Sequence, residues 1–92
     1  MNEETYVSLR RMNAIFDDPQ RSELAKVTAA FDATTAGFIA ASERAAELAR
    51  ALGDEETAVK ERIKAGVMQQ AREMFAFHYA RATGKREGLW DE

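Results

Sequence analysis

The stretch "ALGDEET", residues 51–57, separates two long segments of helical pattern and decides how they meet. Gly53 stands where a helix commonly ends in a left-handed residue, and Asp54 can cap the next helix with its carboxylate. Acidic residues follow Asp54 in the first turn, where the helix macrodipole favours them. A turn this short joins two helices as antiparallel neighbours. The sequence therefore predicts a helical hairpin over residues 19–52 and 55–83.

The segment before the turn carries a heptad pattern, which is typical of a helix packed along a seam. One set recurs every seven residues and a second follows three positions later: Leu24, Phe31, Phe38, Ala45 and Leu52, with Val27, Thr34, Ala41 and Leu48. At the start of the segment, Asp18 is a candidate cap and Pro19 fits a first helical turn. We expect the heptad residues to face the helix after the turn.

The segment after the turn carries two apolar stripes, which is more than one neighbouring helix can cover. The first stripe consists of Val59, Ile63, Val67, Met74 and Phe77, and the second consists of Met68, Ala71, Phe75 and Tyr79. A shorter helical pattern over residues 3–16 spans about half of the hairpin's length. We therefore expect a second copy of the chain to cover Met68, Ala71, Phe75 and Tyr79, which gives a dimeric helical bundle.

Counting residues away from the turn pairs positions across the hairpin. Phe31 falls opposite Phe75, and Gly66 falls opposite Ala40 and Ala41. Small residues on both helices let the backbones approach closely. The sequence therefore predicts a close helix contact at Gly66.

Length and composition indicate one all-α domain over residues 1–92, with residues 83–92 as a tail that contains Trp90. The chain has 92 residues with 18 alanines and one proline, a composition that favours helix. Its net charge is −3 with both signs interspersed, so we do not expect nucleic-acid binding, which uses a strongly basic face. No stretch approaches the ~18 apolar residues of a membrane helix. Because cysteine is absent, a reducing compartment suits the chain, and we expect a cytoplasmic protein.

His78, the only histidine, is the first candidate for chemistry. Metal sites in helical bundles place a Glu three residues before a His, but the residue three before His78 is Phe75. Between Phe77 and Tyr79, a partly buried structural imidazole is the favoured interpretation, and we expect no metal and no cofactor. The alternative is a ligand-binding or catalytic pocket at the bundle interface, formed by His78, Tyr79 and Arg72.

The remaining charged residues fit a solvated helical surface. Glu43 and Glu47 share one face at a spacing of four residues, which favours ion pairs with neighbouring arginines. Basic residues gather near the end of the second long segment, as the helix macrodipole favours: Arg72, Arg81, Lys85 and Arg86. No motif in the chain indicates a reaction. We therefore expect a non-enzymatic protein–protein interaction module that acts as a homodimer, with adaptor, regulatory subunit and phage- or operon-encoded inhibitor as open roles.

Overall fold

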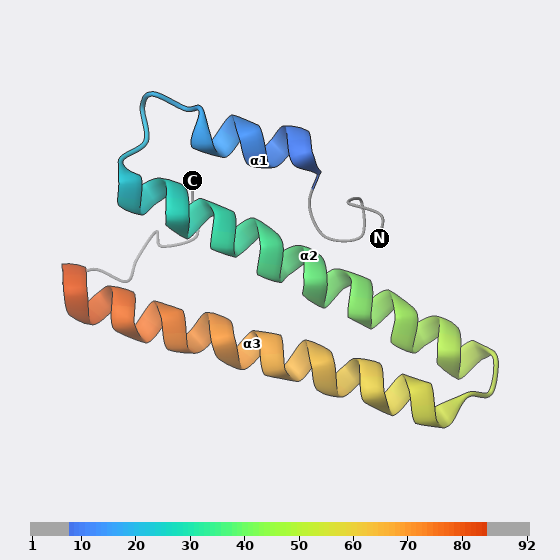
Figure 1. Ribbon diagram of the computed structural model, residues 1–92. Coiled ribbons are helices and arrows are strands. Elements are labelled where there is room, and N and C mark those ends of the chain that lie inside the picture. Colours follow the sequence, from blue (N-terminus) through green and yellow to red (C-terminus); the bar gives the residue numbers. More distant parts are fainter. Residues whose placement is uncertain (1–7, 85–92) are drawn as a thin grey trace.

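The computed structural model describes residues 8–84, and this range contains three helices. Helix α1 spans Leu9–Phe16, α2 spans Glu23–Ala51 and α3 spans Glu55–Thr83. The two long helices run antiparallel side by side, and α1 folds back along the other side of α2 (Figure 1). The predicted hairpin with a short N-terminal helix is confirmed. The tail residues 85–92, with Trp90, lie outside the described range, and the single domain over 1–92 stays a prediction.

The turn between α2 and α3 has the geometry that Gly53 and Asp54 predict. Gly53 has a φ of +80°, and its N–H donates to the Arg50 carbonyl at 3.0 Å. The N–H of Asp54 donates to the Ala49 carbonyl at 2.8 Å, which completes a Schellman motif. The Asp54 carboxylate then accepts the N–H of Thr57 at 3.1 Å and caps α3. One residue ends α2 and the next opens α3, so local interactions reverse the chain.

Helix α2 begins at Glu23 instead of Pro19, and Ser22 is its cap. The Ser22 hydroxyl accepts the N–H of Ala25 at 3.1 Å. The prediction that Asp18 caps this helix was wrong, because its carboxylate is used in the preceding loop. There it accepts the N–H of Gln20 at 2.8 Å and pairs with Nε of Arg21 at 3.2 Å. The Gln20 hydrogen bond, followed by the Arg21 guanidinium, lowers the pKa of the Asp18 carboxyl.

Mostly small residues fill the seam between the two long helices, and the predicted heptad register was right only in part: Phe31 stacks on Phe75 of α3, whereas the leucines of the heptad are exposed. The buried residues are Thr28, Thr35, Ile39, Ser42, Ala46 and Ala49 of α2, with Ala58, Ala65 and Ala76 of α3. Positions 28, 35, 42 and 49 also repeat every seven residues, so a heptad is present on a different face of the helix. Leu24, Val27, Leu48 and Leu52 are exposed. The physical reason is that small side chains let two backbones approach closely, and leucine does not fit between them.

Helix α1 covers a separate, small part of α2. Its Ile15 packs with Ala29 and Ala33, and Ala30 lies beside this cluster. The helix begins at Leu9, where the Ser8 hydroxyl accepts the N–H of Arg11 at 3.1 Å and caps it. The predicted helical residues 3–7 lie outside the described range. Helix α2 thus lies between α1 and α3 (Figure 1).

The arrangement of the three helices is thin and leaves much apolar surface uncovered. The molecule measures 47 × 29 × 16 Å along its principal axes. Among residues 8–84, no large side chain is fully buried. No described helix combines the length and the apolar composition that crossing a bilayer requires.

Candidate functional site

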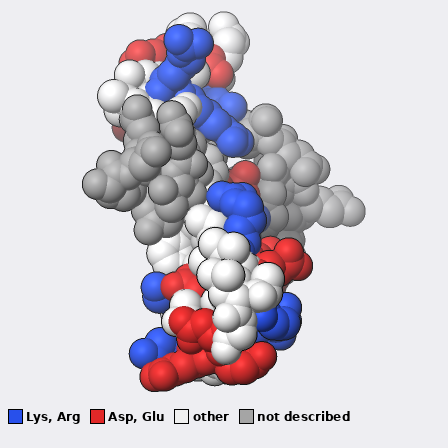
Figure 2. All heavy atoms as spheres, turned by 90° about the vertical axis from the view of Figure 1, so that its right-hand side faces the viewer, with Lys and Arg blue, Asp and Glu red and all other residues white. Residues whose placement is uncertain are grey.

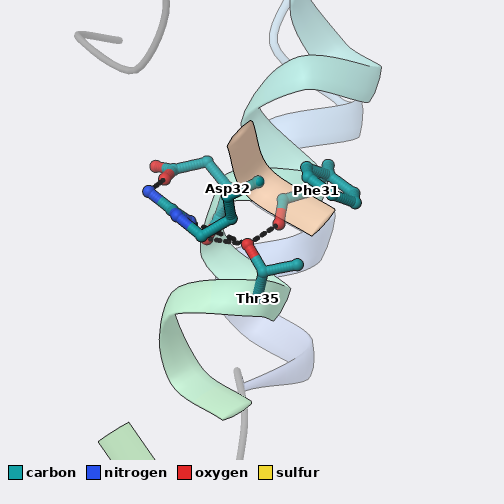
Figure 3. Close-up of polar contacts among 4 residues, drawn as sticks. Phe31, Asp32 and Thr35 are labelled. Atoms are coloured by element: carbon teal, nitrogen blue, oxygen red, sulfur yellow. Dashed lines mark hydrogen bonds and ion pairs between the residues drawn. The ribbon is translucent and has the colours of Figure 1, made fainter. Parts of the chain in front are cut away.

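Arg72 links α3 to α2 through three interactions. Its Nη2 lies 2.8 Å from Oδ1 of Asp32, and its Nη1 donates to the Asp32 carbonyl at 3.1 Å and to the Thr35 hydroxyl at 2.7 Å. The Thr35 hydroxyl in turn donates to the Phe31 carbonyl at 2.7 Å (Figure 3). The side chains of Arg72 and Asp32 are 18% and 25% exposed. Hydrogen bonds to a charged group in such a setting stabilise a fold by ~1.5–3 kcal/mol, so Arg72 is part of the hairpin's structure.

An aromatic stack lies next to this network. The rings of Phe31 and Phe75 are stacked with centroids 4.6 Å apart, which confirms the predicted pairing across the hairpin. Tyr79 continues the stack, with its ring centroid 6.3 Å from that of Phe75. The predicted interface residues are all half-buried: Met68, Ala71, Phe75 and Tyr79. Whether a second copy covers them is not tested by a single chain, and the interface at these four residues stays a prediction.

His78 is exposed, so the expectation of a partly buried imidazole was wrong. Its ring and the Phe77 ring are in a T-shaped arrangement, with centroids 5.4 Å apart. The reason is the rotation of α3 about its axis: the seam with α2 passes through Ala76, and His78 lies about 160° around the helix from it.

The three residues of the predicted pocket do not line one cavity. Arg72 borders a cavity of about 280 Å³ with Ala36, Ile39, Ala40, Glu43 and Gln69. His78 and Tyr79 line neither this cavity nor the larger groove described next. The structure therefore brings Arg72 to a hollow between the helices and leaves His78 on the outer surface.

A groove of about 530 Å³ runs between α2 and α3 near the turn. Its floor contains small residues and its edges carry charges of both signs: Ala46, Ala65 and Gly66, with Glu43, Glu47, Arg50, Arg62 and Gln69. No atom lies within 4 Å of the position that a Cβ on Gly66 would occupy. The predicted close contact at Gly66 was wrong, because the seam passes through its neighbour Ala65 and Gly66 lines the open groove.

The outer face of α3 is an apolar surface that the described chain leaves largely uncovered. We define it by five side chains that are between 52% and 62% exposed: Val59, Ile63, Val67, Met74 and Phe77. Ile63 and Val67 each lie two residues from the buried Ala65, which places them about 160° around the helix from the seam. In Figure 1, no described element lies on this side of α3.

The sequence pattern indicates this stripe but does not place it on the outer side of α3. The sequence contained a signal for this placement. Equal distances from the turn pair Phe75 with Phe31, so the stripe that contains Phe75 must face α2 and the other stripe must face outward. The ion pair between Asp32 and Arg72 was missed altogether. The sequence feature that indicates it is a pair of opposite charges, Asp32 and Arg72, which lie at comparable distances from the turn and each within a largely apolar helix face.

Charged side chains do not form a basic patch on the face seen in Figure 2. Seen from the hairpin turn, Lys and Arg alternate with Asp and Glu over the described residues, and acids gather at the lower end of the view. In the predicted basic cluster, Arg72 is engaged by Asp32, Arg81 is exposed on α3, and Lys85 and Arg86 lie outside the described residues. The described range also holds no group of three or more His, Asp or Glu side chains that could bind a metal ion.

Comparison of the chain with protein-family models, with curated proteins and with solved structures finds no match.

Proposed function

We propose that the chain is a non-enzymatic helical protein–protein interaction module that acts as a homodimer, with the outer face of α3 as its binding surface. One observation carries the proposal: along the side of α3 that faces away from α2, five large apolar side chains, interrupted once by Gln70, are more than half exposed. Exposed apolar patches of this kind mark interaction surfaces in soluble domains.

The exposure of this face makes its burial favourable. Fully burying a Val, Ile, Met or Phe side chain gains ~1.5–3 kcal/mol, so covering a half-exposed one gains roughly 1 kcal/mol. Five such side chains therefore contribute on the order of 5 kcal/mol for each chain. The proposal moves the binding surface from Met68, Ala71, Phe75 and Tyr79 to the outer face, because the former residues are already half-buried and Phe75 stacks on Phe31 of α2.

The alternative, a ligand-binding or catalytic pocket around His78, Tyr79 and Arg72, has less support. The Arg72 guanidinium is already bound to Asp32 and Thr35, and the other two residues border neither cavity described above. We also place the protein in the cytoplasm, because a chain without cysteine suits a reducing compartment.

Affinity capture with paired surface variants tests the proposal. Ile63 and Leu48 are exposed to a similar degree, 59% and 62%, but Leu48 lies on α2. We expect Ile63→Asp to abolish capture of the chain's protein partner, including an untagged copy of the chain, and Leu48→Asp to retain it. Equal capture by wild type and a folded Ile63→Asp variant would reject the outer face of α3 as the binding surface.

A further inference from the structure

We infer that the outer face of α3 binds the same face of a second copy of the chain in an antiparallel arrangement, with Glu56 of each copy beside Arg81 of the other. This inference rests on the proposed function, because it names the partner of the same surface.

The outer face is part of one continuous stripe along nearly the whole of α3. The stripe advances by three or four residues at each step and consists of Glu56, Val59, Ile63, Val67, Gln70, Met74, Phe77 and Arg81, all of them exposed. The average step is close to the 3.6 residues of a helical turn, so the stripe runs straight for about 37 Å. A straight stripe of this length matches a second straight helix.

The stripe is symmetrical about the point between Met68 and Gln69. Three pairs of its residues are equidistant from that point: Val67 and Gln70, Ile63 and Met74, and Glu56 and Arg81. Val59 and Phe77 match within one residue. A two-fold interface brings one patch against its own copy, so residues equidistant from the centre meet across it. An antiparallel pair centred here sets Ile63 level with Met74 and brings Val59 near Phe77, while Val67 lies level with Gln70.

The charges at the two ends of the stripe select the antiparallel arrangement. Parallel helices would set Glu56 beside Glu56 and Arg81 beside Arg81, and both contacts are repulsive. Antiparallel helices set Glu56 beside Arg81 at both ends and also align opposite ends of the macrodipoles.

Within its own chain, Glu56 is only loosely held. Its Oε2 lies 3.4 Å from Nζ of Lys60, and the two side chains are 81% and 66% exposed. Ion pairs at such exposure contribute little to stability, so Glu56 remains available to a second cation.

Gln70 is a polar residue that favours one alignment of the two copies of α3 over others. It lies one and a half residues from the centre of symmetry, so the two copies of Gln70 come close to the two-fold axis. A carboxamide both donates and accepts hydrogen bonds and can therefore pair with its own copy. A single polar residue in an apolar helix interface fixes the register at some cost in stability.

Cysteine pairing in the full chain tests the arrangement directly, because the protein has no cysteine of its own. In the antiparallel pair, position 63 of one copy lies level with position 74 of the other, whereas the two copies of position 63 lie about 16 Å apart along the helices. A disulfide requires Cβ atoms within roughly 4.5 Å of each other. We expect a mixture of Ile63→Cys and Met74→Cys chains to cross-link rapidly, and each variant alone to cross-link slowly, like Leu48→Cys. Fast cross-linking of Ile63→Cys alone would overturn the antiparallel arrangement.

Charge reversal provides an independent test by sedimentation equilibrium at low ionic strength. We expect E56R and R81E each to weaken self-association by about threefold or more, since two contacts become repulsive, and the double variant E56R/R81E to restore it. E55R is the matched control, because it changes the same charge in the same helical turn about 100° around the helix. Net charge alone predicts the opposite for E56R, which brings the chain from −3 to −1.

The outcomes separate this inference from the proposed function. If the wild-type chain is monomeric at high micromolar concentration, the inference and the homodimer of the proposed function are both overturned, and loss of partner capture by Ile63→Asp would still support the outer face of α3 as a binding surface. If Ile63→Asp dissociates the dimer but E56R/R81E does not restore the self-association that E56R and R81E each weaken, the antiparallel register is overturned. The outer face of α3 then remains supported as the binding surface. If Ile63→Asp changes neither self-association nor capture, both proposals fail.

Discussion

Arg72 on α3 and Asp32 on α2 form an ion pair across the hairpin, with Nη2 and Oδ1 2.8 Å apart. The same guanidinium donates to the carbonyl of Asp32 and to the hydroxyl of Thr35. Apart from the neighbouring stack of Phe31 on Phe75, the seam is made mostly of small residues, so this polar link is one of the specific contacts that join α2 to α3.

Removing one partner of this pair should destabilise the fold. We expect Arg72→Ala to lower the free energy of unfolding by about 1–3 kcal/mol, because Asp32 would keep a largely buried charge without its partner. Urea denaturation measures the effect, and a double-mutant cycle with Asp32→Ala isolates the coupling between the two side chains. Lys60→Ala is the control, since its pair with Glu56 is exposed on the surface and should matter by less than ~0.5 kcal/mol. A loss no larger than that of Lys60→Ala would contradict the role of Arg72.

The same substitution at two glycines should have opposite effects. Gly66→Ala should raise the free energy of unfolding by up to ~1 kcal/mol, because alanine favours helix and its Cβ meets no atom within 4 Å. Gly53→Ala should lower it by ~1–2 kcal/mol, because the φ of +80° strains any residue with a Cβ. Thermal unfolding followed by circular dichroism distinguishes the two. Destabilisation by Gly66→Ala would restore the close helix contact that the sequence suggested.

Asp54 should make stability fall in acid. Hydrogen bonds from the Thr57 hydroxyl and from the Thr57 N–H hold the pKa of its carboxyl below the ordinary value of 3.8. Because the folded-state pKa is lowered, the contribution of the carboxylate is complete above the unfolded pKa and is lost as the pH falls through the folded value. We expect the urea concentration at the unfolding midpoint to decrease as the pH is lowered below 4. Asp54→Asn keeps the cap without the charge, so its urea midpoint should depend less on pH in this acid range. Identical acid limbs in the two proteins would assign the pH dependence to other carboxylates.

Gln70 should limit the strength of self-association. Replacing it by leucine adds apolar surface near the inferred two-fold axis in both copies, so Gln70→Leu should tighten the dimer by roughly tenfold or more. Sedimentation equilibrium measures this dissociation constant. Gln69→Leu serves as the control, because Gln69 lines the groove beside Gly66. Equal gains from both variants would indicate nonspecific association of apolar surface.

The sequence by itself determined the features that depend on neighbouring residues. Gly53 and Asp54 set the end of α2, the start of α3 and the reversal between them, because a left-handed residue and a capping carboxylate act within a few residues. The antiparallel hairpin and the pairing of Phe31 with Phe75 followed from that turn by counting along two rigid helices.

Only the tertiary structure decided how each helix is rotated about its axis. The heptad of Leu24, Leu48 and Leu52 and the heptad of Thr28, Ser42 and Ala49 have the same period, so the pattern in the sequence does not rank one face over the other. Which face of α2 packs against α3 depends on how the surfaces of the two helices fit together. Here small residues of α2 pack against small residues of α3, and Arg72 pairs with Asp32 across the seam. That rotation left His78, Gly66 and the row from Val59 to Phe77 in the open, because residues on one helix are positioned by contacts that lie some forty residues away along the chain.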